Sequence, residues 1–186
     1  MIDPTRDDST AVADALRPRT LAWLALASGA GALAGLLWSL WAPRDVLKVV
    51  NGQAFPDGMQ SEAYIAAEGI ATALLVAFGI LITAAIVARW RRQPLIALTV
   101  AAASAVVGSV VFWIIATAVH AAQVAQFPTV LVPGTHPLAP LTVRMPAVYI
   151  TWLLTAVVIV AIQALVLWVI DRPDSEPDDS ETAPAG

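Results

Sequence analysis

The sequence contains no cysteine, only two histidines and few charged residues. Without cysteine the chain has no disulfide bond, no thiolate nucleophile and no cysteine-ligated metal. Charged residues make up 13% of the 186 residues and hydrophobic residues make up 59%. A soluble domain has about 25% and about 45–50%, so these values exclude a soluble globular domain and, for most of the chain, a disordered one. We therefore expect a membrane protein.

Four long apolar runs can each form a membrane-spanning helix, which needs roughly 20 residues. They cover residues 20–42, about 63–88, 95–119 and 147–170. The runs are continuous rather than alternating, which favours helices over the strands of a membrane barrel. The first run ends Ser39-Leu40-Trp41-Ala42-Pro43, which is no small-residue cleavage site, so we expect a retained helix rather than a signal peptide. The predicted fold is an all-α membrane protein with four transmembrane helices.

Positive residues indicate how the four spans are threaded, because lysine and arginine favour the cytoplasmic side. Seven fall in the N-terminal tail (1–19), in the second connection (Arg89, Arg91 and Arg92) and after the last span. Three fall in the outer connections 43–62 and 120–146, namely Arg44, Lys48 and Arg144. Both termini should then be cytoplasmic and the protein should lie in the plasma membrane. Trp38 and Trp152 are expected near the outer interface.

The C-terminal segment 171–186 differs sharply in composition from the spans. It carries six acidic residues, one arginine and three prolines. Such a segment cannot bury apolar area, so we expect a disordered acidic tail on the cytoplasmic side.

The two outer connections predict a small β-containing cap. Asn51-Gly52 between β-prone arms is typical of a hairpin. The long third connection has β-prone patches at residues 129–132 and 141–143, with a Pro133-Gly134 turn between them. An isolated hairpin is marginally stable, so we expect the two loops to meet and form a sheet over the outer helix ends. The apolar residues of this cap would be Val49, Phe55, Leu131 and Leu141.

Small residues four apart mark two helix-packing positions. Gly31 and Gly35 form one pair, and Ser104 and Gly108 form the other. Small residues allow membrane helices to approach closely. The pairs favour packing within one four-helix bundle, with a homodimer face as the alternative.

Glu68 is the one acid clearly inside a predicted span. An ionisable residue in a span is a candidate for ion handling, although a structural or interfacial pairing is the preferred interpretation. Its candidate cationic partners are Arg44, Lys48 and Arg144. Gln163 in the fourth span is expected to form a structural hydrogen bond between helices.

No motif indicates an enzyme or a cofactor. His120 and His136 lack the spacing of a zinc site, and no nucleophile motif is present, so we expect no metal, no cofactor and no catalytic residue. The basic cluster at Arg89, Arg91 and Arg92 suits contact with anionic lipids of the inner leaflet rather than with nucleic acid.

The segment from Asp57 to Gly69 carries a family resemblance. An Asp-Gly pair precedes a helix start Ile65-Ala66-Ala67-Glu68-Gly69, and the later outer loop contains Pro137-Leu138-Ala139-Pro140-Leu141. This pattern resembles a family of four-span actinobacterial membrane proteins that carries only a domain-of-unknown-function label. The resemblance would cover about residues 21–170. It implies a plasma-membrane location and no established activity.

Three functions remain open from the sequence. The favoured one is a non-catalytic accessory or scaffold protein of the cell envelope, whose partners are the lipid bilayer and other envelope proteins bound through the outer loops. The alternative is a small transporter or ion-coupled protein that uses Glu68. The third option is an envelope enzyme.

Overall fold

The computed structural model describes residues 18–56 and 62–170. These residues form four long helices and one two-stranded sheet: α2 (Pro18–Trp41), β1 (Leu47–Val50), β2 (Gln53–Pro56), α3 (Glu62–Arg89), α4 (Pro94–Ala125) and α5 (Ala147–Ile170). All four helices are long and apolar enough to cross a membrane, which confirms the prediction of four such helices. The expected acidic tail and most of the N-terminal tail lie outside the described residues.

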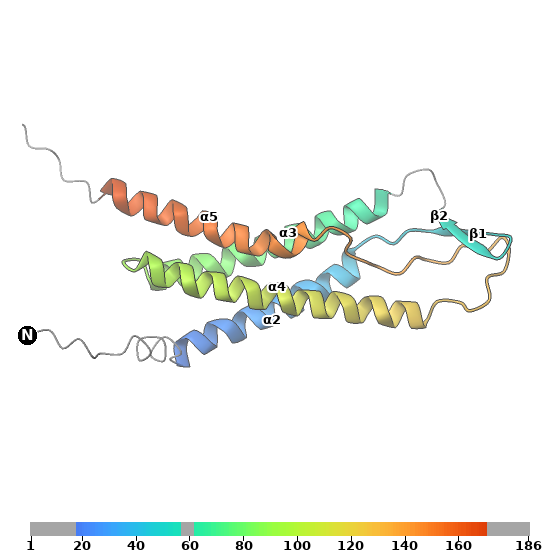
Figure 1. Ribbon diagram of the computed structural model, residues 1–186, viewed down its shortest axis with the longest axis horizontal. Helices are drawn as coiled ribbons and strands as arrows, with labels where there is room; N and C mark the ends of the chain where they lie inside the picture. The colour runs from blue at the N-terminus through green and yellow to red at the C-terminus, as the bar shows by residue number, and fades with distance from the viewer. Residues whose placement is uncertain (1–17, 57–61, 171–186) are drawn as a thin grey trace, which may run out of the picture.

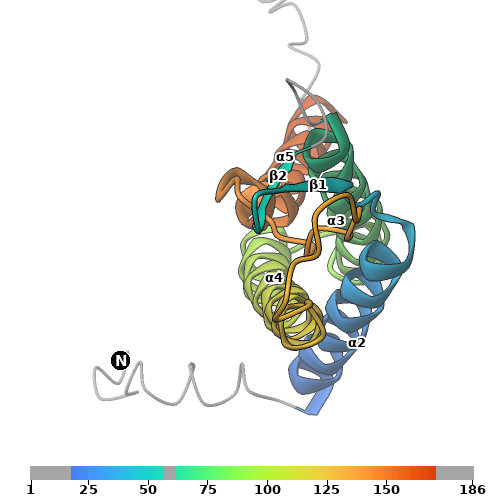
Figure 2. The ribbon, with the colours of Figure 1, turned by 90° about the vertical axis from the view of Figure 1, so that its right-hand side faces the viewer.

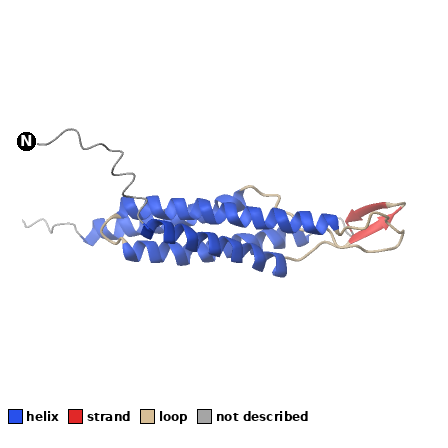
Figure 3. Ribbon diagram, turned by 90° about the horizontal axis from the view of Figure 1, so that it is seen from below, coloured by secondary structure: helices blue, strands red, loops and turns tan. Residues whose placement is uncertain are grey.

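The helices form an elongated antiparallel bundle with the strands at one end (Figures 1 and 3). The start of α2, the turn between α3 and α4, and the end of α5 lie at the opposite end, which we call the turn end. Seen from the strand end, α2 lies beside α4, α4 beside α5, and α5 beside α3 (Figure 2). The neighbours of α4 are therefore mainly α2 and α5, although the chain joins α4 directly to α3.

Helix α4 is longer than the predicted span and ends at Ala125 rather than near Val119. The added residues include three alanines, which favour helix, and no helix breaker occurs before Pro128. At 1.5 Å per residue the 32 residues of α4 extend about 48 Å. A bilayer's hydrocarbon core is about 30 Å thick, so α4 is long enough to cross it and continue beyond.

Two of the tryptophans that the sequence predicts near the outer interface, Trp38 and Trp152, are buried between the helices. Trp38 and Trp152 are each 0% exposed. Trp38 packs edge-on against Phe112, with 6.0 Å between ring centroids. The indole of Trp152 lies against the backbones of Gly79 on α3 and Gly108 on α4. The Trp152 ring fills space that the two glycines leave open, and such packing depends on neighbours that the local sequence does not show.

The predicted hairpin is confirmed in strands β1 and β2. They pair antiparallel, with Val50 opposite Gln53. Asn51 and Gly52 form the two-residue turn with φ angles of 51° and 74°. Positive φ at both positions matches the twist of a two-residue hairpin and is best tolerated by Asn and Gly.

The connections on either side of the α3–α4 pair meet, as the sequence predicts, but through a different segment of the second one. Residues 134–139 run antiparallel along the free edge of β1. Val49 donates to the Thr135 carbonyl (3.2 Å) and accepts from Gly134 (3.2 Å), while Leu47 donates to the Pro137 carbonyl (2.8 Å). A bridge between Val46 and Leu138 and a bond from Ala139 to the Asp45 carbonyl extend this pairing. We call the hairpin together with residues 134–139 the cap.

The β-prone patches at residues 129–132 and 141–143 form no strands, so that part of the prediction is wrong. Val130 and Val132 are 75% and 55% exposed, because the free edge of β1 is already occupied by the segment that follows them. The predicted Pro133-Gly134 turn is confirmed: Thr135 donates to the Val132 carbonyl, and Gly134 has a φ of 84°. Of the predicted cap residues, Val49 and Leu141 are buried, Leu131 is half-buried and Phe55 is exposed.

Hydrogen exchange should reveal the pairing within the cap. The amides of Leu47, Val49 and Ala139 donate across the two loops, so in nanodiscs they should exchange roughly five- to tenfold more slowly than those of Val130 and Val132. Equal exchange at all five amides would show that the two loops do not pair.

Candidate functional site

Glu68 is buried where α3 meets the start of α5. The residue is 4% exposed. Its Oε1 accepts hydrogen bonds from the backbone N–H groups of Arg144 (2.7 Å) and Met145 (2.9 Å), which lie three and two residues before the start of α5. A carboxylate at a helix N-terminus is stabilised by the positive end of the helix dipole and by the unpaired amides there. Glu68 therefore fixes the chain that enters α5 against α3.

Two further contacts surround this position. The indole Nε1 of Trp38 on α2 donates to the carbonyl of Ala67, at 2.9 Å. The guanidinium of Arg144 lies over the ring of Tyr64, 5.1 Å from its centroid. We call Trp38, Ala67, Glu68, Arg144 and Met145 the Glu68 junction. It joins α2, α3 and the start of α5 in one place.

The cationic side chains that the sequence proposes as partners of Glu68 occupy other positions. Arg44 and Lys48 are exposed on the segment that leads into and forms the cap. Arg144 does contact Glu68, but through its backbone N–H rather than its guanidinium. The sequence singles out the acid and one partner residue, and only the fold shows that the bonded groups belong to the main chain.

A second set of hydrogen bonds between a helix and a loop was not predicted from the sequence. The backbone N–H of Leu141 donates to Oε1 of Gln123 (2.6 Å), and Nδ1 of His120 lies 2.8 Å from the Leu141 carbonyl. Because a carbonyl can only accept, Nδ1 of His120 carries the hydrogen. The signal in the sequence is the pair His120 and Gln123, three residues apart, at the end of an apolar run. In residues 18–56 and 62–170, no group of three or more metal-ligating side chains lies together.

The small residues singled out from the sequence lie where α2 crosses α4 within one chain. A Cβ on Gly31 would collide with the backbone carbonyl of Gly108, and one on Gly35 would lie 2.7 Å from Cγ2 of Ile115. Ser104 is fully buried one turn before Gly108. Gly108 has α2 on one side and the Trp152 ring of α5 on the other. The glycines thus occupy the interior of the bundle.

Gln163 bonds to a turn rather than to another helix. Its Nε2 donates to the carbonyl of Arg91, at 2.9 Å. This bond ties α5 to residues 90–93, which connect α3 and α4. It gives Gln163 a structural position at the turn end.

The described interior of the bundle contains few polar groups. Among residues 18–56 and 62–170, the buried polar or charged residues are Glu68, Thr83, Ser104 and Ser109. The three hydroxyl oxygens have no hydrogen-bond partner, and neither has Nε1 of Trp152. A path for ions or polar solutes through these residues would have to rely on this small set.

Comparisons with protein-family models, with curated proteins and with solved structures give no match. The resemblance to the actinobacterial four-span family therefore stays a prediction.

Proposed function

We propose that this chain is an integral protein of the plasma membrane with four spans and both termini in the cytoplasm. The four apolar helices and their antiparallel arrangement support this proposal. The described side chains of Arg89, Arg91 and Arg92 lie at the turn end, where the positive-inside rule favours the cytoplasm. The cap then faces outward.

Its function is that of a non-catalytic accessory or scaffold component of the cell envelope, which binds partners through the cap. The observation that carries this proposal is the structural role of the Glu68 side chain. The ionisable group expected of a transporter accepts two backbone hydrogen bonds and holds α5 in place. The cap meanwhile presents exposed apolar side chains, including Phe55 and Leu138, which are 49% and 53% exposed.

A small transporter is the second candidate. Glu68 and the unpaired hydroxyls of Thr83, Ser104 and Ser109 favour it, because unpaired polar groups in a membrane interior are costly and often mark a path for ions or solutes. The two candidates differ in their dependence on the charge of Glu68. An accessory protein should keep its partners when Glu68 is replaced by a residue that cannot ionise.

Site-specific photocrosslinking tests the accessory function. A crosslinking amino acid at Phe55 or Leu138 should join the protein to one defined envelope partner in native membranes. The same group at Gln93 in the turn between α3 and α4 is the matched control and should not join that partner. If the cap positions give no defined product, or if Gln93 gives the same one, the cap is not the partner-binding surface.

Cysteine labelling tests the threading. The natural sequence has no cysteine, so single substitutions at Thr5, Gln53, Gln93 and Thr135 introduce one reactive group each. In intact cells an impermeant thiol reagent should label the cap positions Gln53 and Thr135 and should leave Thr5 and Gln93 unlabelled. The reverse pattern would overturn the orientation, and labelling of all four only after lysis would show that the bundle does not span the plasma membrane.

A further inference from the structure

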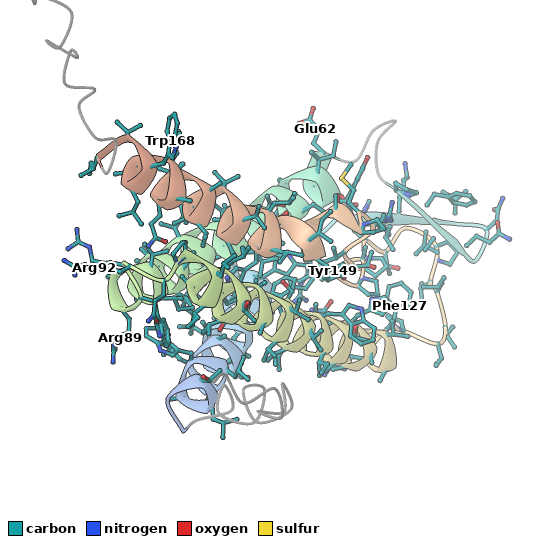
Figure 4. All side chains as sticks on the ribbon, turned by 60° about the vertical axis from the view of Figure 1, so that its left-hand side comes forward. Glu62, Arg89, Arg92, Phe127, Tyr149 and Trp168 are labelled. Carbon is teal, nitrogen blue, oxygen red and sulfur yellow. The ribbon has the colours of Figure 1, made fainter. Side chains whose placement is uncertain are left out.

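The turn end of the bundle carries a concentration of positive charge. Arg89 ends α3, and Arg91 and Arg92 follow in the turn before α4. Figure 4 shows the side chains of Arg89 and Arg92 extending from this end of the ribbon. The acidic side chains of the described residues, at Asp45, Glu62 and Glu68, belong to the opposite half of the molecule. Within the described residues, no acid at the turn end balances these arginines.

A shallow groove lies beside the arginines, between α2 and α3. It is lined by Ala22, Trp23, Leu26, Arg89 and Trp90 and has a volume of about 420 Å³. The ring centroids of Trp23 and Trp90 lie 6.2 Å apart, and Cζ of Arg89 lies 5.8 Å from the ring centroid of Trp90. The groove therefore has apolar walls and a guanidinium at its rim. A second hollow, formed by residues 88–93, shares Arg89 and Trp90 with it.

The start of α4 adds a further attraction for an anion at the same place. Gln93 precedes the helix and makes no side-chain capping bond, and Pro94 is its first residue. The first backbone N–H groups of a helix lack partners within it, and the helix dipole makes this end positive. Phosphate groups bind such ends. The bond from Gln163 to the Arg91 carbonyl holds the turn in this conformation.

We propose that the turn end binds one anionic phospholipid of the inner leaflet. Its phosphate lies against Arg89, Arg91, Arg92 and the start of α4, and one acyl chain lies along Trp23 and Leu26 in the groove. The apolar groove beside the arginines favours a phospholipid over a soluble phosphate, because a soluble ligand would leave the groove empty. This inference rests on the proposed membrane location and adds a lipid-binding site to it.

Native mass spectrometry of the full-length protein in detergent gives the test. Phosphatidylglycerol should remain bound as one molecule per chain and more tightly than phosphatidylcholine or glycerol 3-phosphate. A basic residue near an anionic membrane surface contributes about 1 kcal/mol, which corresponds to roughly fivefold in affinity. The triple variant Arg89→Gln, Arg91→Gln and Arg92→Gln should therefore bind phosphatidylglycerol on the order of 100-fold more weakly.

Matched variants separate the site from general charge and from misfolding. The pair Arg44→Gln and Lys48→Gln removes charge from the cap side and should leave binding unchanged. The pair Arg91→Lys and Arg92→Lys keeps the charge at the turn and should retain most of the affinity. Trp23→Ala should weaken binding of phosphatidylglycerol, because it removes one wall of the groove.

Four results would overturn the proposal. Phosphatidylcholine or glycerol 3-phosphate could bind as tightly as phosphatidylglycerol. The triple variant could bind phosphatidylglycerol as tightly as the natural protein, or phosphatidylglycerol could bind only after deletion of residues 171–186. In the last case the acidic tail would occupy the arginines in the full chain. Extraction of the protein from membranes by alkaline carbonate would instead contradict the proposed membrane location, so the two failures are distinguishable.

Discussion

Replacing Gly31 with alanine should lower the free energy of unfolding by about 1–3 kcal/mol. A Cβ at this position meets the carbonyl oxygen and the Cα of Gly108, which are backbone atoms and cannot rotate away. Helix α2 must then move away from α4, and the contact between the rings of Trp38 on α2 and Phe112 on α4 is disturbed. Unfolding of the purified protein with increasing SDS, followed by tryptophan fluorescence, measures the change.

Gly29 offers a matched control on the same helix. A Cβ there meets nothing within 4 Å, so Gly29→Ala should be neutral or slightly stabilising, since alanine favours helix more than glycine. Equal destabilisation by the two substitutions would show that α2 and α4 do not cross at Gly31. A change of oligomeric state in Gly31→Ala alone would instead support the homodimer face that the small residues also allow.

Replacing Glu68 with alanine should destabilise the protein by about 3 kcal/mol, because it leaves two backbone N–H groups without their charged acceptor. Glu68→Gln keeps an oxygen at the position of Oε1 and removes the charge, so its loss should be about 1 kcal/mol. Both values can be measured by the same SDS titration. The exposed acid Glu62 at the start of the same helix provides the control, and Glu62→Gln should have little effect.

The same Glu68→Gln variant distinguishes the two candidate functions. An accessory protein should fold and keep its crosslink to the envelope partner. A transporter should fold and lose its flux, because glutamine retains the shape of glutamate and cannot ionise. A pH-dependent flux in proteoliposomes that disappears in the folded Glu68→Gln protein would contradict the accessory function.

Much of the fold could be predicted because it depends on local properties of the chain. Long apolar runs predict the helices regardless of what they pack against. The hairpin follows from Asn51 and Gly52, since both turn positions require a positive φ. The turn at Pro133 and Gly134 has a similar local cause.

The parts that failed depend on residues far apart in the chain. The segment that joins β1 is selected by the free edge of that strand, and its sequence, which includes Pro137, gave no sign of strand pairing. The backbone N–H groups that bind Glu68 carry no sequence signature, since every residue except proline has a backbone N–H group. The burial of Trp152 was not predicted, because it depends on Gly79 and Gly108, which two other helices bring against its ring.

The hydrogen bonds of Glu68 have a consequence for how the protein is made. The carboxylate is synthesised 76 residues before the first amide that binds it. At 5–20 residues per second, that interval lasts roughly 4–15 seconds. During it, α3 carries a carboxylate whose native donors do not yet exist, and a lone charge is unfavourable in hydrocarbon. If the chain is inserted into a membrane as proposed, we expect the newly made α3 to remain at the lateral gate of the insertion machinery until α5 emerges, so that α5 releases a helix made before it.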